Sequence, residues 1–167
     1  MSIDRESRRG RVYDRRPHNL ELPGTKGDSR MIDLTLDMAE RAAKAALAKA
    51  KQLGTVMTAS VVDESGRTVL IMRGDGAGFL STETSRAKAM AAANFRKSTK
   101  ELGDMVAKGS PFWAAAPAVL KGEVLPSIGA VPLTKGGRVI GAIGCGGGTG
   151  EQDHECAAAG AEAIGAA

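Results

Sequence analysis

The residues of this chain best suited to chemistry are a lysine, an aspartate and a histidine that lie far apart in the sequence. Lys88 stands in an alanine-rich segment, where small neighbours favour a partly desolvated amine that can act as a base or nucleophile. Asp63 ends an apolar run just before a turn. His154 follows one other histidine, His18, and its imidazole changes charge near neutral pH. We therefore predict Lys88, Asp63 and His154 as catalytic residues.

Each of the three also has a purely structural interpretation, which the sequence leaves open. Asp63 would bind backbone amides of the turn that ends near Gly66. Lys88 would lie on a solvated face of a helix, and His154 would be a surface histidine on the first turn of another helix.

An arginine beside a glycine-rich loop is the first candidate for ligand binding. Arg73 precedes the loop 74–78, and its guanidinium offers two parallel donors to a carboxylate or phosphate. The structural alternative is an ion pair with Asp63 or Asp75. We predict that Arg73 and Lys88 face one pocket and bind the anionic part of a small ligand.

A glycine run at 146–148 joins an expected strand to the last expected helix. Backbone amides at such a helix start attract anions, and the alternative is a tight crossover or a subunit contact. Asp153 and Glu155 suit the positive end of the same helix. We predict Gly146, Gly147, Asp153 and Glu155 as further ligand-binding residues.

No metal site is predicted. The chain has two histidines and two cysteines, Cys145 and Cys156, and their spacing with His154 matches no structural zinc pattern. The glycine run lacks the Lys-Ser/Thr of a phosphate-binding loop, and Thr149 stands where a dinucleotide fingerprint needs its third glycine.

Composition separates a basic N-terminal arm from one domain. Residues 1–30 carry eight Lys or Arg and five Asp or Glu without apolar periodicity, so we predict a flexible arm followed by a domain at 31–167. Aromatic residues make up 3 % of the chain, which argues against stacking on nucleic acid bases. No apolar run reaches the ~18 residues of a membrane span, so we expect a cytoplasmic protein without membrane or nucleic acid partners.

Periodicity predicts alternating helices and strand hairpins in the domain. Hairpins pair antiparallel, so the fold class is α+β. The expected helices are 36–53, 81–96, 99–106 and 151–164, the expected strands are 55–63, 68–73, 131–134 and 138–145, and the proline-containing segment 109–130 is expected to be a loop.

Four separated motifs resemble the GlcG/HbpS-like family over about residues 32–165. They are Val-Val-Asp-Glu-Ser-Gly at 61–66 with its continuation to 77, Ser-Arg-Ala-Lys-Ala at 85–89, Val-Pro-Leu at 131–133 with Gly-Arg-Val-Ile-Gly-Ala-Ile-Gly at 137–144, and Gln-Asp-His-Glu at 152–155. The chain departs from the family in two places. It has Gly-Cys-Gly-Gly-Gly at 144–148 where the family usually has Gly-Val-Ser-Gly, and Ala91 where a threonine is frequent.

The resemblance implies a profilin-like α/β/α sandwich, with a central antiparallel sheet flanked by helices, and a homo-oligomer. Members of the family include haem-binding proteins, corrinoid-associated domains and hydroxylaminobenzoate lyases. On that basis we predict a cofactor-independent lyase that acts on a small carboxylated aromatic such as 4-hydroxylaminobenzoate. The alternatives are a protein that binds haem or another tetrapyrrole (a corrinoid) without catalysis, and an accessory protein with no chemistry.

Overall fold

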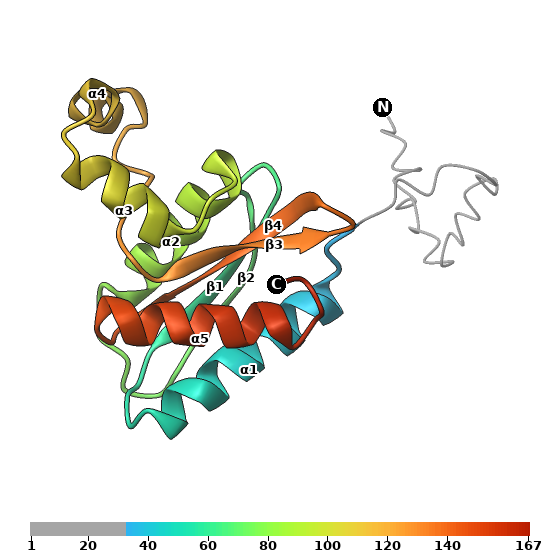
Figure 1. Cartoon of the computed structure of the whole chain (residues 1–167). Coiled ribbons are helices and arrows are strands. Elements are labelled where there is room, and N and C mark those ends of the chain that lie inside the picture. The colour runs from blue at the N-terminus through green and yellow to red at the C-terminus, as the bar shows by residue number, and fades with distance from the viewer. Residues whose placement is uncertain (1–32) are drawn as a thin grey trace, which may run out of the picture. The chain divides into compact units, whose positions relative to one another are not determined.

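The structure, a computed structural model, describes residues 33–167 apart from the side chain of Pro117, and these residues form one compact unit (Figure 1). The arm predicted at 1–30 lies outside the described residues. In chain order the elements are α1 (Leu36–Gln52), β1 (Thr58–Asp63), β2 (Thr68–Arg73), α2 (Ser81–Phe95), α3 (Thr99–Ala107), α4 (Pro111–Val119), β3 (Ala130–Lys135), β4 (Arg138–Gly146) and α5 (Gly150–Glu162).

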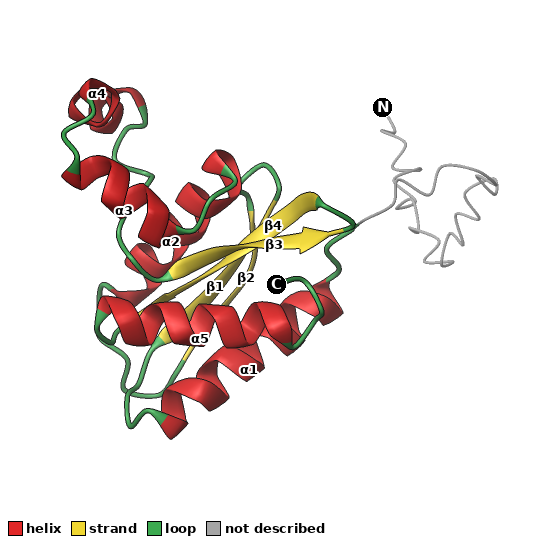
Figure 2. Ribbon diagram, viewed as in Figure 1, coloured by secondary structure: helices red, strands yellow, loops and turns green. Residues whose placement is uncertain are grey.

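The four strands form one antiparallel sheet in the order β2-β1-β4-β3, which confirms the predicted fold class. Helix α2 covers one face of the sheet, and α1 and α5 cover the other face side by side (Figure 2). Buried alanines line the inner side of α1, so this helix lies close to the sheet. None of the described helices is long and apolar enough to span a membrane.

The contact between α2 and the sheet depends on glycines of β4 and on small hydroxyl side chains. A Cβ atom on Gly144 would lie 2.4 Å from the Ser85 carbonyl oxygen, so only glycine permits this approach. Two buried hydroxyl pairs join α2 to β1: Thr58 with Ser81 at 2.8 Å and Ser60 with Ser85 at 2.7 Å. The aromatic-poor sequence thus builds thin, closely spaced layers.

Helix α4 occupies part of the segment that the sequence predicts as a loop, so that prediction is wrong. Pro111 stands at the start of the helix, where the missing N–H has no intrahelical partner to lose. Trp113 and Ala116 bury one side of α4 in a small satellite core with Leu102 of α3. The helix lies away from the central sheet (Figure 1).

Candidate functional site

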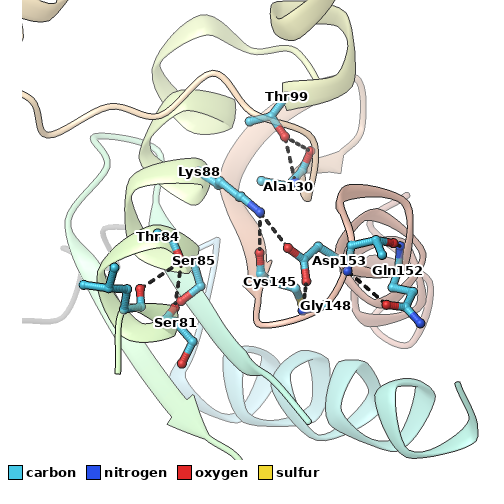
Figure 3. A network of polar contacts seen from close by, with 12 residues as sticks. Ser81, Thr84, Ser85, Lys88, Thr99, Ala130, Cys145, Gly148, Gln152 and Asp153 are labelled. Carbon is cyan, nitrogen blue, oxygen red and sulfur yellow. Dashed lines mark hydrogen bonds and ion pairs between the residues drawn. The ribbon is translucent and has the colours of Figure 1, made fainter. Parts of the chain in front are cut away.

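A buried ion pair connects α2 to the first turn of α5 (Figure 3). Lys88 Nζ donates to Asp153 Oδ2 at 2.6 Å and to the Cys145 carbonyl oxygen at 3.3 Å. The two side chains are 8 % and 3 % exposed. Lys88 is therefore not on a solvated helix face, and its ammonium is already neutralised by a carboxylate of the protein.

The start of α5 holds Asp153 within reach of Lys88. Thr149 and Gln152 form a reciprocal capping box that starts α5. Asp153 Oδ1 then accepts the backbone N–H of Gly148 at 3.0 Å. Gly129, with φ +135°, leaves room for the pair, because a Cβ there would lie 2.8 Å from Lys88 Nζ. The Gly148 amide at the start of α5, in the segment predicted to attract an anion, thus binds a carboxylate of the protein itself.

The glycines predicted to bind a ligand lie at close contacts between chain segments. A Cβ on Gly146 would lie 2.8 Å from Thr84 Oγ1 of α2. Gly147 has φ +130°, and a Cβ there would lie 2.7 Å from the Val56 carbonyl oxygen. This geometry corresponds to the tight crossover that the sequence left open, and the ligand-binding role of both glycines stays a prediction.

Asp63 and Arg73 both contact the backbone near their own turns. Asp63 Oδ1 accepts the N–H groups of Ser65 at 2.8 Å and Arg67 at 2.9 Å. Arg73 Nη2 donates to the Ala77 carbonyl oxygen at 2.5 Å, and the ion pair considered for it with Asp63 or Asp75 is absent from the described contacts.

The expected convergence of Arg73 and Lys88 on one pocket is not observed. Arg73 lies on the edge strand β2 and binds the loop that follows it, whereas Lys88 binds Asp153 beyond the end of β4. Neither side chain lines any of the three concavities described below. Two cations that each have a partner of their own do not need a shared anion.

His154 lines a hollow of ≈ 180 Å³ with Lys100, Ile128, Glu151 and Glu155. Its Nδ1 atom is buried and has no hydrogen-bond partner among the described residues. Burial, and then the positive charge of Lys100, lower the pKa of His154 below 6.5, and Glu155 opposes them. The imidazole is therefore neutral at pH 7. Because Nδ1 is buried, a ligand in the hollow would have to bind Nε2.

Glu155, the other ligand-binding candidate of this helix, lies on the wall of the same hollow. Its carboxylate is 3.4 Å from the ammonium of Lys49 on α1, so the two helices are joined at the surface here. The structure thus brings Glu155 and His154 together, and it gives Asp153 a separate, buried partner.

Two larger concavities were not predicted from the sequence. One, of ≈ 410 Å³, lies at the C-terminal end of α1 and includes Leu47, Val56 and Met57. The other, of ≈ 370 Å³, lies between α2 and the segment that follows α4. Their walls combine side chains from segments that are far apart in the sequence, so no local motif marks them.

The chain is similar to proteins whose names refer to haem or corrinoids. The family model described as "Haem degrading protein HbpS-like" matches residues 34–162. An uncharacterized 15.0 kDa protein of Citrobacter freundii, from the dhaT-dhaS intergenic region, is 37 % identical over 121 residues, which cover 72 % of this chain and 84 % of that protein.

Two further relatives are associated with tetrapyrroles by name. The corrinoid adenosyltransferase PduO of Salmonella typhimurium is 32 % identical over 114 residues, which cover 68 % of this chain but only 34 % of that enzyme. The crystal structure of a PduOC:haem complex superposes with a TM-score of 0.74 at 30 % identity, covering 80 % of this chain and 96 % of that one. With the family match across nearly all of the described residues, the chain belongs to the HbpS-like family.

Proposed function

We propose that this chain binds haem or another tetrapyrrole. The observation that carries the proposal is His154, the single histidine of the described residues, which lines the hollow and whose ring is neutral at pH 7. Imidazole is a common axial ligand of haem iron. The haem complex of PduOC, a relative with the same fold, supports this choice of ligand.

The residues that line the hollow of His154 include groups that could contact a haem, but the hollow is too small to cover the whole haem. Lys100 would pair with a propionate, and Ile128 would contact the ring. A hollow of ≈ 180 Å³ is smaller than the roughly 300–1,000 Å³ typical of small-molecule sites, so a second surface must complete it. Bound haem would supply redox and gas-binding chemistry at its iron.

A haemin titration tests the proposal. We expect the protein to shift and sharpen the Soret band of haemin to saturation, and His154→Ala to lose that band. His18→Ala is the matched control, since it removes the only other histidine of the chain and should leave the band unchanged. Saturable binding that His154→Ala leaves intact would reject His154 as the ligand, and no binding by the natural chain would reject haem as the tetrapyrrole.

A lyase acting on a small carboxylated aromatic is the second candidate. The buried Lys88–Asp153 pair favours it, since a desolvated ion pair is costly to form and Lys88 is an amine that could act as a base or nucleophile. Incubation with 4-hydroxylaminobenzoate, without added cofactor, should then consume the compound at a rate proportional to protein. Equal consumption by folded Lys88→Met protein would exclude Lys88 from the reaction.

We also propose that copies of this chain associate, as the incomplete hollow requires. Apolar side chains exposed on α4 support this, because Phe112 is 53 % and Val119 76 % exposed. Light scattering at micromolar concentration should give a mass well above 17.2 kDa. The two free cysteines suit a reducing compartment, so we propose a cytoplasmic location.

A further inference from the structure

We infer that the concavity between α2 and the segment after α4, here called the α2–α4 cleft, is a separate binding site for a small apolar carboxylate. Its volume of ≈ 370 Å³ falls within the roughly 300–1,000 Å³ of small-molecule sites. The lining residues used below are Met90, Asn94, Phe95, Leu120, Lys121 and Val124. The inference does not depend on tetrapyrrole binding, because none of these residues lines the hollow of His154.

The cleft borders the aromatic cluster of the described domain. Phe95 lies 5.1 Å from Trp113 and 5.9 Å from Phe112, measured between ring centroids. Three of the four aromatic side chains at 33–167 therefore gather here, in a chain that is only 3 % aromatic. The same satellite core includes Leu120 and Val124, which line the cleft. One wall of the cleft is thus apolar and polarizable, which suits a hydrocarbon ring or short chain.

An unusual polar group lies in this satellite core. Trp113 is 8 % exposed, and its Nε1 has no hydrogen-bond partner among the described residues. Buried indole N–H groups normally find a partner, so an unsatisfied one calls for an explanation. Because Trp113 packs in one core with Phe95 and Leu120, its indole senses any ligand that moves those side chains.

One lysine, Lys121, lines the cleft. Lys121 lines it with φ +52°, a left-handed conformation that is strained for a residue other than glycine. Arg96, which directly follows the lining residue Phe95, is the other such residue of the described chain. Arg86 directs Nη1 to the sulfur of Met90 at 2.8 Å, and a thioether is only a weak acceptor. Among the residues that line the cleft, Lys121 is the one base and Glu123 the one acid.

These features define the chemistry of the ligand. Met90, Phe95 and Val124 would contact a carbon skeleton, while Lys121 would pair with a carboxylate at the open end. The amide of Asn94 and the hydroxyl of Ser65 offer further polar contacts at the rim.

Benzoate and its uncharged analogue benzamide are suitable probes for the full-length protein. Trp113 is the only tryptophan, so the indole N–H signal in a ¹H–¹⁵N spectrum reports on this core without ambiguity. We expect benzoate to shift that signal to saturation and benzamide to bind about three- to tenfold more weakly, as expected for one partly exposed charged contact.

Lys121→Gly is the decisive variant, because glycine adopts φ +52° without strain and the fold should be kept. We expect it to bind benzoate only as weakly as benzamide, while Lys44→Ala on α1, whose ammonium pairs with Glu40, binds benzoate normally. Equal affinity for the two probes, or full benzoate affinity in Lys121→Gly, would overturn the inference. So would the lack of a saturable shift up to about 10 mM benzoate.

A haemin titration of Lys121→Gly separates this inference from the tetrapyrrole proposal. Unchanged haemin binding, together with weakened benzoate binding, supports two distinct sites. Loss of haemin binding in Lys121→Gly but not in His154→Ala would overturn the separateness of the cleft, since haem propionates would then be the carboxylates it binds. Failure of benzoate binding leaves the test of His154 unaffected.

Discussion

The ammonium of Lys88 and the carboxylate of Asp153 lie 2.6 Å apart in the interior, although 65 positions separate them in the sequence. The pair joins the helix on one face of the sheet to the start of a helix on the other face (Figure 3). Its geometry fixes where β4 ends and α5 begins, because Lys88 also holds the Cys145 carbonyl and Asp153 holds the Gly148 amide. We therefore expect the Lys88–Asp153 pair to contribute first of all to the stability of the fold.

Removing one member of this pair should destabilise the fold strongly. In Lys88→Met the Asp153 carboxylate loses its counter-charge while it remains buried, and breaking such a pair costs about 3–5 kcal/mol. Urea unfolding of the variant and the natural chain measures the difference. The double variant Lys88→Met/Asp153→Leu should recover part of the loss, since no isolated charge remains. A single-variant loss below about 1 kcal/mol would mean that water reaches the pair in solution.

The sequence predicted the elements well because most of them carry strong local signals. Helix α1 has alanines at helical spacing and a threonine N-cap, and the turn at Gly136–Gly137 is a strong hairpin signal. Helix α4 lacked such a signal, since Pro111 and Pro117 suggested a loop and its stability depends on packing Trp113 against α3. Tertiary contacts, and not the local sequence, therefore determine that α4 is helical.

The site was harder to predict than the fold. Lys88, Asp153 and His154 were all singled out from the sequence, but no spacing rule relates residues that meet only after the sheet has formed. Lys88 was expected to bind a ligand with Arg73, and the structure gives it Asp153 instead. No local sequence pattern marks the α2–α4 cleft, since its walls combine residues of α2 with the segment after α4, and the left-handed conformation of Lys121 is visible only in the structure.

Glycine at position 144 should be indispensable for the packing of α2. A Cβ there would lie 2.4 Å from the Ser85 carbonyl oxygen and 2.7 Å from the Ala89 nitrogen, and neither backbone atom can move without displacing the helix. We expect Gly144→Ala to lose about 1–3 kcal/mol of unfolding free energy or more.

Gly78→Ala provides the matched control for this substitution, because a Cβ on Gly78 meets no atom within 4 Å and its φ is not left-handed. Its unfolding free energy should stay the same or rise by about 0.4–1 kcal/mol, since alanine restricts the unfolded chain. Thermal denaturation of the two variants in parallel measures the contrast. Similar losses in both would contradict the close contact at Gly144.

Both cysteines should resist alkylation in the native protein. Burial raises the pKa of Cys156 to about 11 and holds the pKa of Cys145 well above its ordinary range. The thiolate is the reactive form, so neither residue should react with iodoacetamide at pH 8 except through unfolding. Mass spectrometry should find no adduct on the native chain and two adducts in urea, one for each cysteine. Rapid native labelling of either cysteine would contradict its burial.

The last prediction concerns acid stability and depends on His154. Burial first, and Lys100 second, lower its pKa below 6.5 in the folded state, so the unfolded chain takes up the proton more readily. Stability attributable to this residue is therefore complete above pH 6.5 and falls as the pH drops below that value. An NMR titration of the His154 ring signal, assigned by its loss in His154→Gln, should place its midpoint below 6.5. In His154→Gln the unfolding free energy should depend less on pH between 5 and 6.5.

A His154 midpoint at or above 6.5, or an unchanged pH dependence in the variant, would show that the hollow is open enough to hydrate the charged ring. It would also mean that a proton competes with haem iron for the imidazole of His154 at neutral pH. Haemin affinity should then rise steeply between pH 6 and 8.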